Sequence, residues 1–131
     1  MRILELLVEN KEFNLALEDF LPFAKKQLKL KKLPKMTFVK SFDEDEQPSF
    51  GGYDTGTGTI EIATDGRHPI DVLRTLAHEL VHYKQDQENR LNPHSGETGS
   101  DEENEANVIA GIIMRRFNKR YSKHLVKKKG P

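Results

Sequence analysis

The sequence contains no cysteine among its 131 residues. Without cysteine the chain can form no disulfide and can offer no thiolate to a metal ion. Any zinc site must therefore be built from histidine and carboxylate side chains. The absence of cysteine is also typical of proteins from reducing compartments, and we expect this protein to be cytoplasmic.

Two further absences restrict the partners of the protein. The 21 lysine and arginine residues balance 21 aspartate and glutamate residues, so no overall charge favours nucleic acid or a membrane surface. No apolar run approaches the roughly 20 residues that are needed to cross a membrane. Residues 1–8 are partly apolar, but Arg2 and Glu5 interrupt them and they are too short for a signal peptide. We therefore expect no membrane partner.

The length indicates one small domain, residues 1–131, with a modest core and no internal repeat. The C-terminal region is basic, and its last part is a tail at residues 122–131. The positive charges of this region are Arg115, Arg116, Lys119, Arg120, Lys123, Lys127, Lys128 and Lys129. Positive charge at the end of a helix complements the helix dipole, which is the simpler interpretation. Contact with nucleic acid through the tail is an alternative that we do not favour.

The pattern of apolar residues before residue 68 predicts one helix and three short strands. The helix is expected over about 13–31, with Asn14 as its N-cap and Pro22 near its middle. The strands are expected at about 36–42, 50–53 and 59–63. An acidic loop at 43–48 separates the first two strands, and turn-forming residues at 54–58 separate the last two. We expect a small, mostly antiparallel sheet.

The pentapeptide His-Glu-Leu-Val-His at residues 78–82 is the most informative segment of the chain. Two histidines four apart on a helix project from the same face, so both imidazoles can bind one metal ion. The glutamate that follows the first histidine then reaches a water molecule on that metal. We therefore predict that His78 and His82 bind Zn²⁺ and that Glu79 is the catalytic general base.

The residues around this pentapeptide predict an amphipathic helix from about 69 to 90. Pro69 suits a first helical turn, and Asp71 complements the positive end of the helix dipole. An apolar stripe at helical spacing consists of Ile70, Leu73, Ala77, Leu80 and Val81. A surface helix with solvated histidines is the competing interpretation, and this apolar stripe argues against it.

A catalytic zinc site needs a third protein ligand. The candidates are His94, Glu97, Glu102, Glu103 and Glu105. A last helix is predicted over about 101–121, with Ser100 as its N-cap and Glu103 where a capping box wants a carboxylate. A ligand on a helix is held more rigidly than one on a loop, which favours the helical glutamates.

Helical periodicity favours Glu103 within this group. Glu103, Ala106 and Asn107 lie along one line of the predicted helix. In this arrangement Glu103 binds the metal, Ala106 leaves room for helix packing, and Asn107 orients a ligating histidine. Glu102 and Glu105 lie on a neighbouring line and stay alternatives, together with His94.

These two motifs together resemble the gluzincin metallopeptidases. They are most similar to the small single-domain ImmA/IrrE-like branch, in which a Glu-x-Glu-Ala-Asn run opens the helix after the active-site helix. Here that run is residues 103–107, and residues 75–83 also resemble small zincin domains, including phage-encoded ones. The similarity covers about residues 59–114. If the chain is phage-encoded, its location would be the host cytoplasm or the virion.

The resemblance implies an α+β, zincin-like metallopeptidase domain. An N-terminal helix and a small three-stranded sheet would pack on the active-site helix and a ligand-bearing C-terminal helix. Zinc lowers the pKa of its bound water toward about 7, and Glu79 takes the proton as the water attacks a peptide carbonyl. The partner would be a protein or peptide substrate. After Asn107 the family usually continues with Phe-Ala, whereas Val108 and Ile109 follow here, so the natural substrate does not carry over.

Two features of this active site stay open. A further donor usually stabilises the oxyanion, and the candidates are Tyr53, Tyr83, Tyr121 and His124. An ordinary packing or surface role is the favoured interpretation of each of them. The strand at 59–63 is either an exposed sheet edge that pairs with an extended substrate or an ordinary structural strand.

The competing function is a non-catalytic module that keeps zinc for stability and binds protein or nucleic acid, for example as a phage accessory component. Glu79 argues against it, because a structural zinc site has no need of a general base. The oligomeric state does not follow from the sequence.

Overall fold

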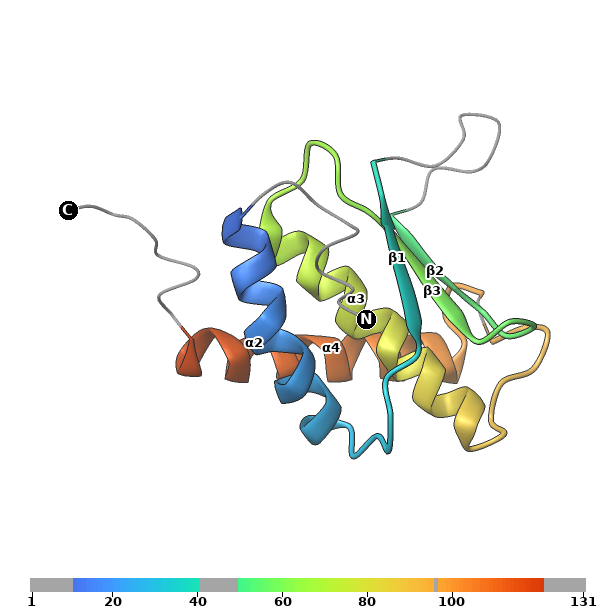
Figure 1. The fold of residues 1–131 in the computed structure, drawn as a ribbon. Helices are drawn as coiled ribbons and strands as arrows, with labels where there is room; N and C mark the ends of the chain where they lie inside the picture. The colour runs from blue at the N-terminus through green and yellow to red at the C-terminus, as the bar shows by residue number, and fades with distance from the viewer. Residues whose placement is uncertain (1–10, 41–49, 96, 122–131) are drawn as a thin grey trace.

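Figure 1 shows the protein as a computed structural model, in which residues 11–40, 50–95 and 97–121 are described. The acidic loop expected at 43–48 and residues 122–131 of the basic tail, with His124, lie outside the described residues. The elements in chain order are α2 (Lys11–Gln27), β1 (Lys35–Val39), β2 (Gly51–Asp54), β3 (Thr59–Ala63), α3 (Pro69–Gln87) and α4 (Asp101–Arg120). The described part is therefore α+β, as expected.

The three strands form one sheet in the order β1-β3-β2. β2 runs antiparallel to β3, whereas β1 runs parallel to it. The expectation of a mostly antiparallel sheet was therefore wrong, because one of the two strand pairs is parallel. β3 lies in the centre, so residues 59–63 form an ordinary structural strand and not a sheet edge.

The hairpin between β2 and β3 explains why these two strands are antiparallel. The Asp54 carboxylate accepts a hydrogen bond from the Gly56 N–H at 2.8 Å, and the Asp54 carbonyl accepts one from the Gly58 N–H at 2.7 Å. Gly58 has φ of +73°, which glycine adopts without steric cost. The side chains of Ile60 and Ile62 on β3 are fully buried, which suits a strand with neighbours on both sides.

The boundaries of α2 differ from the expected ones. The helix starts at Lys11, so Asn14 lies inside it and is not its N-cap. It continues through Pro22 and ends at Gln27. Lys29 then takes a left-handed conformation, with φ of +56°, while the Leu30 N–H bonds back to the Lys25 carbonyl. This is a common way for a helix to end, and it stops α2 before the expected residue 31.

Helix α3 is the centre of the molecule, because it contacts the sheet, α2 and α4 (Figure 1). It starts at Pro69, as expected, and buries Leu73, Leu76 and Leu80 completely. A second part of the core joins α2 to α4, where the rings of Phe20 and Phe117 meet edge to face with centroids 5.1 Å apart. None of the described helices is both long enough and apolar enough to cross a membrane.

Gly51 marks the closest approach of β2 to α3. A Cβ atom on Gly51 would lie 2.7 Å from Thr75 Cγ2 and 2.9 Å from Ile62 Cδ1, whereas one on Gly52 would meet no atom within 4 Å. We expect Gly51→Ala to lower the free energy of unfolding by about 1–3 kcal/mol. The control Gly52→Ala should change it by less than about 1 kcal/mol. Urea denaturation measures both, and equal effects would contradict the close approach.

Candidate metal centre

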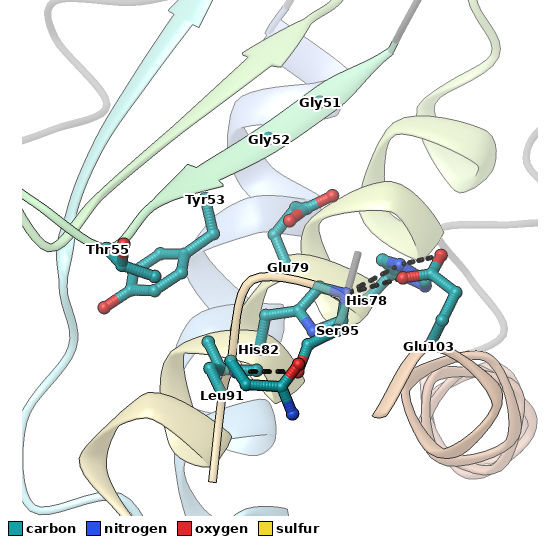
Figure 2. A pocket seen from close by; sticks show the side chains of 11 residues that line it. Gly51, Gly52, Tyr53, Thr55, His78, Glu79, His82, Leu91, Ser95 and Glu103 are labelled. Atoms are coloured by element: carbon teal, nitrogen blue, oxygen red, sulfur yellow. Dashed lines mark hydrogen bonds and ion pairs between the residues drawn. The ribbon is translucent and has the colours of Figure 1, made fainter. Parts of the chain in front are cut away.

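Three metal-ligating side chains converge between α3 and α4. The Nε2 atoms of His78 and His82 lie 3.2 Å apart. One carboxylate oxygen of Glu103 lies 3.0 Å from His78 Nε2, and the other lies 3.0 Å from His82 Nε2. Figure 2 shows the three side chains turned toward one another, with the histidines on α3 and the glutamate on α4. Among the described residues, these three form the one group of histidine and carboxylate ligands close enough to share an ion.

The first turn of α4 positions Glu103. Ser100 is the N-cap, and its hydroxyl accepts a hydrogen bond from the Glu103 N–H at 3.0 Å, as the sequence predicts. The Glu103 carboxylate does not return to the cap, as it would in a full capping box, but faces the imidazoles. Ala106 and Ala110 are buried on the same helix, and their small side chains let α4 lie close to α3.

The donor set fits a zinc ion. Zinc binds imidazole nitrogen and carboxylate oxygen at about 2.0–2.2 Å, so ligand atoms of a tetrahedral site lie roughly 3.3 Å apart. The observed separations of 3.0 to 3.2 Å are close to this value. A proton on an imidazole nitrogen or a shared cation can each hold the two imidazoles and the carboxylate at these distances, and the donor types are those that zinc prefers.

Burial favours the neutral, ligating form of His78. Desolvation lowers its pKa from the ordinary value, and the Glu103 carboxylate opposes this shift. A hydrogen bond between the side chains of His78 and Asn107 also opposes it. Asn107 therefore contacts a histidine of the site, which is the arrangement that helical periodicity predicts. The neutral imidazole is the form that binds a metal ion.

Glu79 lies beside the histidines and projects toward β2 (Figure 2). Its side chain is buried, and this burial raises its pKa from 4.5 to about 7. The His82 imidazole acts against this shift, and the Glu103 carboxylate adds to it. A carboxyl group with a pKa near neutrality is suited both to accept and to return a proton.

The histidines, Glu79 and Glu103 line a cavity of about 430 Å³. Strand β2 forms one wall with Gly51, Gly52 and Tyr53, and the segment between α3 and α4 contributes Leu91, Asn92 and Ser95. The site therefore has space for a ligand next to its ionisable groups. Because the wall at β2 is made largely of glycine, a main chain can approach it closely.

The structure places three of the four candidate oxyanion donors, Tyr53, Tyr83 and Tyr121. Tyr53 lines the cavity, but its hydroxyl donates to Asp86 at 2.5 Å and points away from the imidazoles (Figure 2). Burial, and then this hydrogen bond, raise the pKa of Tyr53 above its ordinary value. Tyr83 is buried, and Tyr121 packs on Phe117 at the other end of α4. The last candidate, His124, is not among the described residues.

The other candidates for the third ligand have different partners. His94 is exposed, and its Nδ1 lies 2.8 Å from a carboxylate oxygen of Glu97. Glu105 accepts hydrogen bonds from Gln85 at 2.7 Å and from Arg90 at 2.8 Å. Glu102 offers its main-chain carbonyl to the same Gln85 amide. The structure thus brings Glu103, and not these residues, to the two histidines.

Gln85 is the residue near the site that the sequence interpretation missed. It is 1% exposed, and its Oε1 lies 2.8 Å from His82 Nδ1. A signal was present, because a glutamine three residues after His82 falls on the buried side of a helix. Residues at this spacing share a helical face, but many buried polar residues have no role in a site.

Comparison of the chain with models of protein families, with curated proteins and with solved structures found no match. The resemblance of its motifs to gluzincins therefore stays an interpretation of short segments.

The raised pKa of Glu79 predicts a pH-dependent stability of the metal-free protein. A carboxyl group whose pKa is higher in the folded state destabilises the fold as pH rises from about 4.5 to 7. In EDTA we expect Glu79→Gln to be more stable than the wild type by about 2–3 kcal/mol at pH 8, and by almost nothing at pH 4.5. Urea denaturation across this range measures the difference. The exposed Glu61→Gln serves as control, and a difference that does not change with pH would contradict the burial of an ionisable Glu79.

Proposed function

We propose that the protein is a zinc-dependent metalloendopeptidase with His78, His82 and Glu103 as its metal ligands. The observation that carries this proposal is the convergence of two imidazoles and a carboxylate at 3.0 to 3.2 Å, with a buried glutamate in the same cavity. The α+β arrangement is compatible with a minimal zincin domain, which is the fold we propose. The proposal follows the resemblance of the motifs.

Zinc held by these three protein ligands would leave a position for water and would lower the pKa of that water toward about 7. Glu79 then has a defined task. As a carboxylate it accepts the proton of the attacking water, while the water oxygen bonds to the carbonyl carbon of a peptide. The protonated Glu79 later gives a proton to the amine as the carbon–nitrogen bond breaks.

Strand β2 is the element that we propose to receive the substrate. It is the outer strand of the sheet on the side of the cavity, and Gly51 and Gly52 line the same cavity as the histidines. An extended peptide can add to the outer strand of a sheet through main-chain hydrogen bonds. The sequence allowed residues 59–63 to pair with an extended substrate as a sheet edge. We propose this pairing for the neighbouring strand β2 instead.

The general base can be tested separately from the metal. We expect the wild-type protein to bind one zinc ion and to cleave a protein such as casein, and Glu79→Gln to keep the zinc. Its cleavage rate should fall by about 10²- to 10⁴-fold, because the variant cannot accept a proton. Metal analysis and a cleavage assay measure the two properties, with Glu61→Gln as control. A wild type that keeps zinc without cleaving a range of peptides would favour the non-catalytic module.

The third ligand can be tested by a pair of neighbouring glutamates. We expect Glu103→Gln to weaken zinc binding at least about tenfold, because an amide is a poorer ligand than a carboxylate. Glu102→Gln should bind zinc as the wild type does, since this side chain does not belong to the convergent group. Competition with a chromogenic chelator measures both affinities. The opposite ranking would assign the third ligand to Glu102.

A further inference from the structure

Gln85 connects the two helices that carry the proposed metal ligands. It lies on α3, one turn after His82, and is 1% exposed. Its Oε1 is 2.8 Å from His82 Nδ1. Its Nε2 donates to the Glu102 carbonyl at 3.0 Å and to a Glu105 carboxylate oxygen at 2.7 Å, both on α4. Every polar atom of this buried side chain therefore has a partner.

These partners fix the orientation of the Gln85 amide. A carbonyl and a carboxylate can only accept hydrogen bonds, so the NH₂ group of Gln85 must face Glu102 and Glu105. The amide oxygen then faces His82. In the flipped orientation the amide oxygen would instead face two other acceptors, the Glu102 carbonyl and the Glu105 carboxylate. Because the amide oxygen cannot donate, the hydrogen between the two residues belongs to His82 Nδ1. His82 Nε2 faces the Glu103 carboxylate and His78, and it either carries a second hydrogen toward Glu103 or, in the neutral imidazole, offers its lone pair to a metal ion.

We propose that Gln85 is a positioning residue that fixes the tautomer and the ring orientation of His82 for metal binding. The inference rests on the proposed function, because it assigns a use to the His82 Nε2 lone pair. Arg90 extends the network outward, since its guanidinium donates to the same Glu105 carboxylate oxygen at 2.8 Å. The order of contacts from the surface to the site is Arg90, Glu105, Gln85 and His82.

The charge of Glu105 strengthens this arrangement. Its carboxylate accepts hydrogen bonds from Gln85 at 2.7 Å and from Arg90 at 2.8 Å. A negative charge next to the Gln85 NH₂ group polarises the amide and increases the negative charge on its oxygen. A stronger acceptor at Nδ1–H makes the imidazole a better electron donor at Nε2.

The tautomer can be observed without any metal. In the full chain labelled with ¹⁵N-histidine, in EDTA at pH 8, long-range proton–nitrogen spectra distinguish the two neutral forms of each imidazole. We expect His82, assigned from the spectrum of His82→Asn, to carry a proton on Nδ1, whether or not Nε2 also carries one toward Glu103. A His82 ring whose Nδ1 carries no proton would overturn the inference, whatever the protein then does with zinc or with peptides.

A matched pair of glutamines on α3 tests the effect on metal binding. Gln85→Met removes the acceptor but keeps the length of the side chain, and Gln87→Met makes the same change at an exposed position of the same helix. We expect Gln85→Met to bind zinc about 10- to 100-fold more weakly and to show a mixture of His82 tautomers, with Gln87→Met like the wild type. Unchanged zinc affinity in Gln85→Met would overturn the proposal.

Failure of this inference differs from failure of the proposed function. A wild type that binds no zinc would refute the metallopeptidase proposal, while the tautomer of His82 would still decide whether Gln85 fixes the ring. Conversely, a peptidase that binds zinc but whose metal-free form has no proton on His82 Nδ1 would refute the role of Gln85 alone. If Gln85→Met does not fold, the wild-type spectrum still shows whether His82 Nδ1 carries the proton that the inference requires.

Discussion

The packing of the first turn of α4 against the middle of α3 is the constraint on which the site depends. The two imidazoles belong to one helix and need only helical geometry to face the same way. The carboxylate of Glu103 reaches them because α4 packs closely on α3, where the small side chain of Ala106, next to Glu103 on the same line of α4, is fully buried. A bulkier contact would separate the helices and leave the histidines without their acidic partner.

Helix α3 buries an unusual number of polar side chains for a central helix. Glu79, His82 and Gln85 are all buried, and they follow one another at intervals of three residues. Burying a polar group costs free energy unless it is hydrogen-bonded or charge-paired. Gln85 and His82 satisfy each other, whereas Glu79 faces the cavity with a raised pKa. Polarity of this kind in a core is typical of a site and not of a purely structural helix.

Local patterns in the sequence predicted local features well. The phase of α3, its start at Pro69, the Ser100 cap and the line through Glu103 and Asn107 depend on residues within a few turns of one another. The order and direction of the strands in the sheet could not be predicted from local patterns, because strand pairing depends on contacts between distant segments. Residues 59–63 have the same alternating pattern in the centre of a sheet or at its edge. The role of Gln85 required coordinates, since the sequence shows its helical face but not what the partner helix places opposite.

All proposed ligands and the base lie within residues 78–103, a single helix–loop–helix unit. Because this segment is short, holding its ends together costs little chain entropy. A bound cation would therefore crosslink two successive helices. Phe117, farther along α4, packs on Phe20 of α2. Helix α4 therefore carries both the carboxylate that completes the proposed centre and a contact to α2. In such a small protein, a bound cation would stabilise the fold as well as the site.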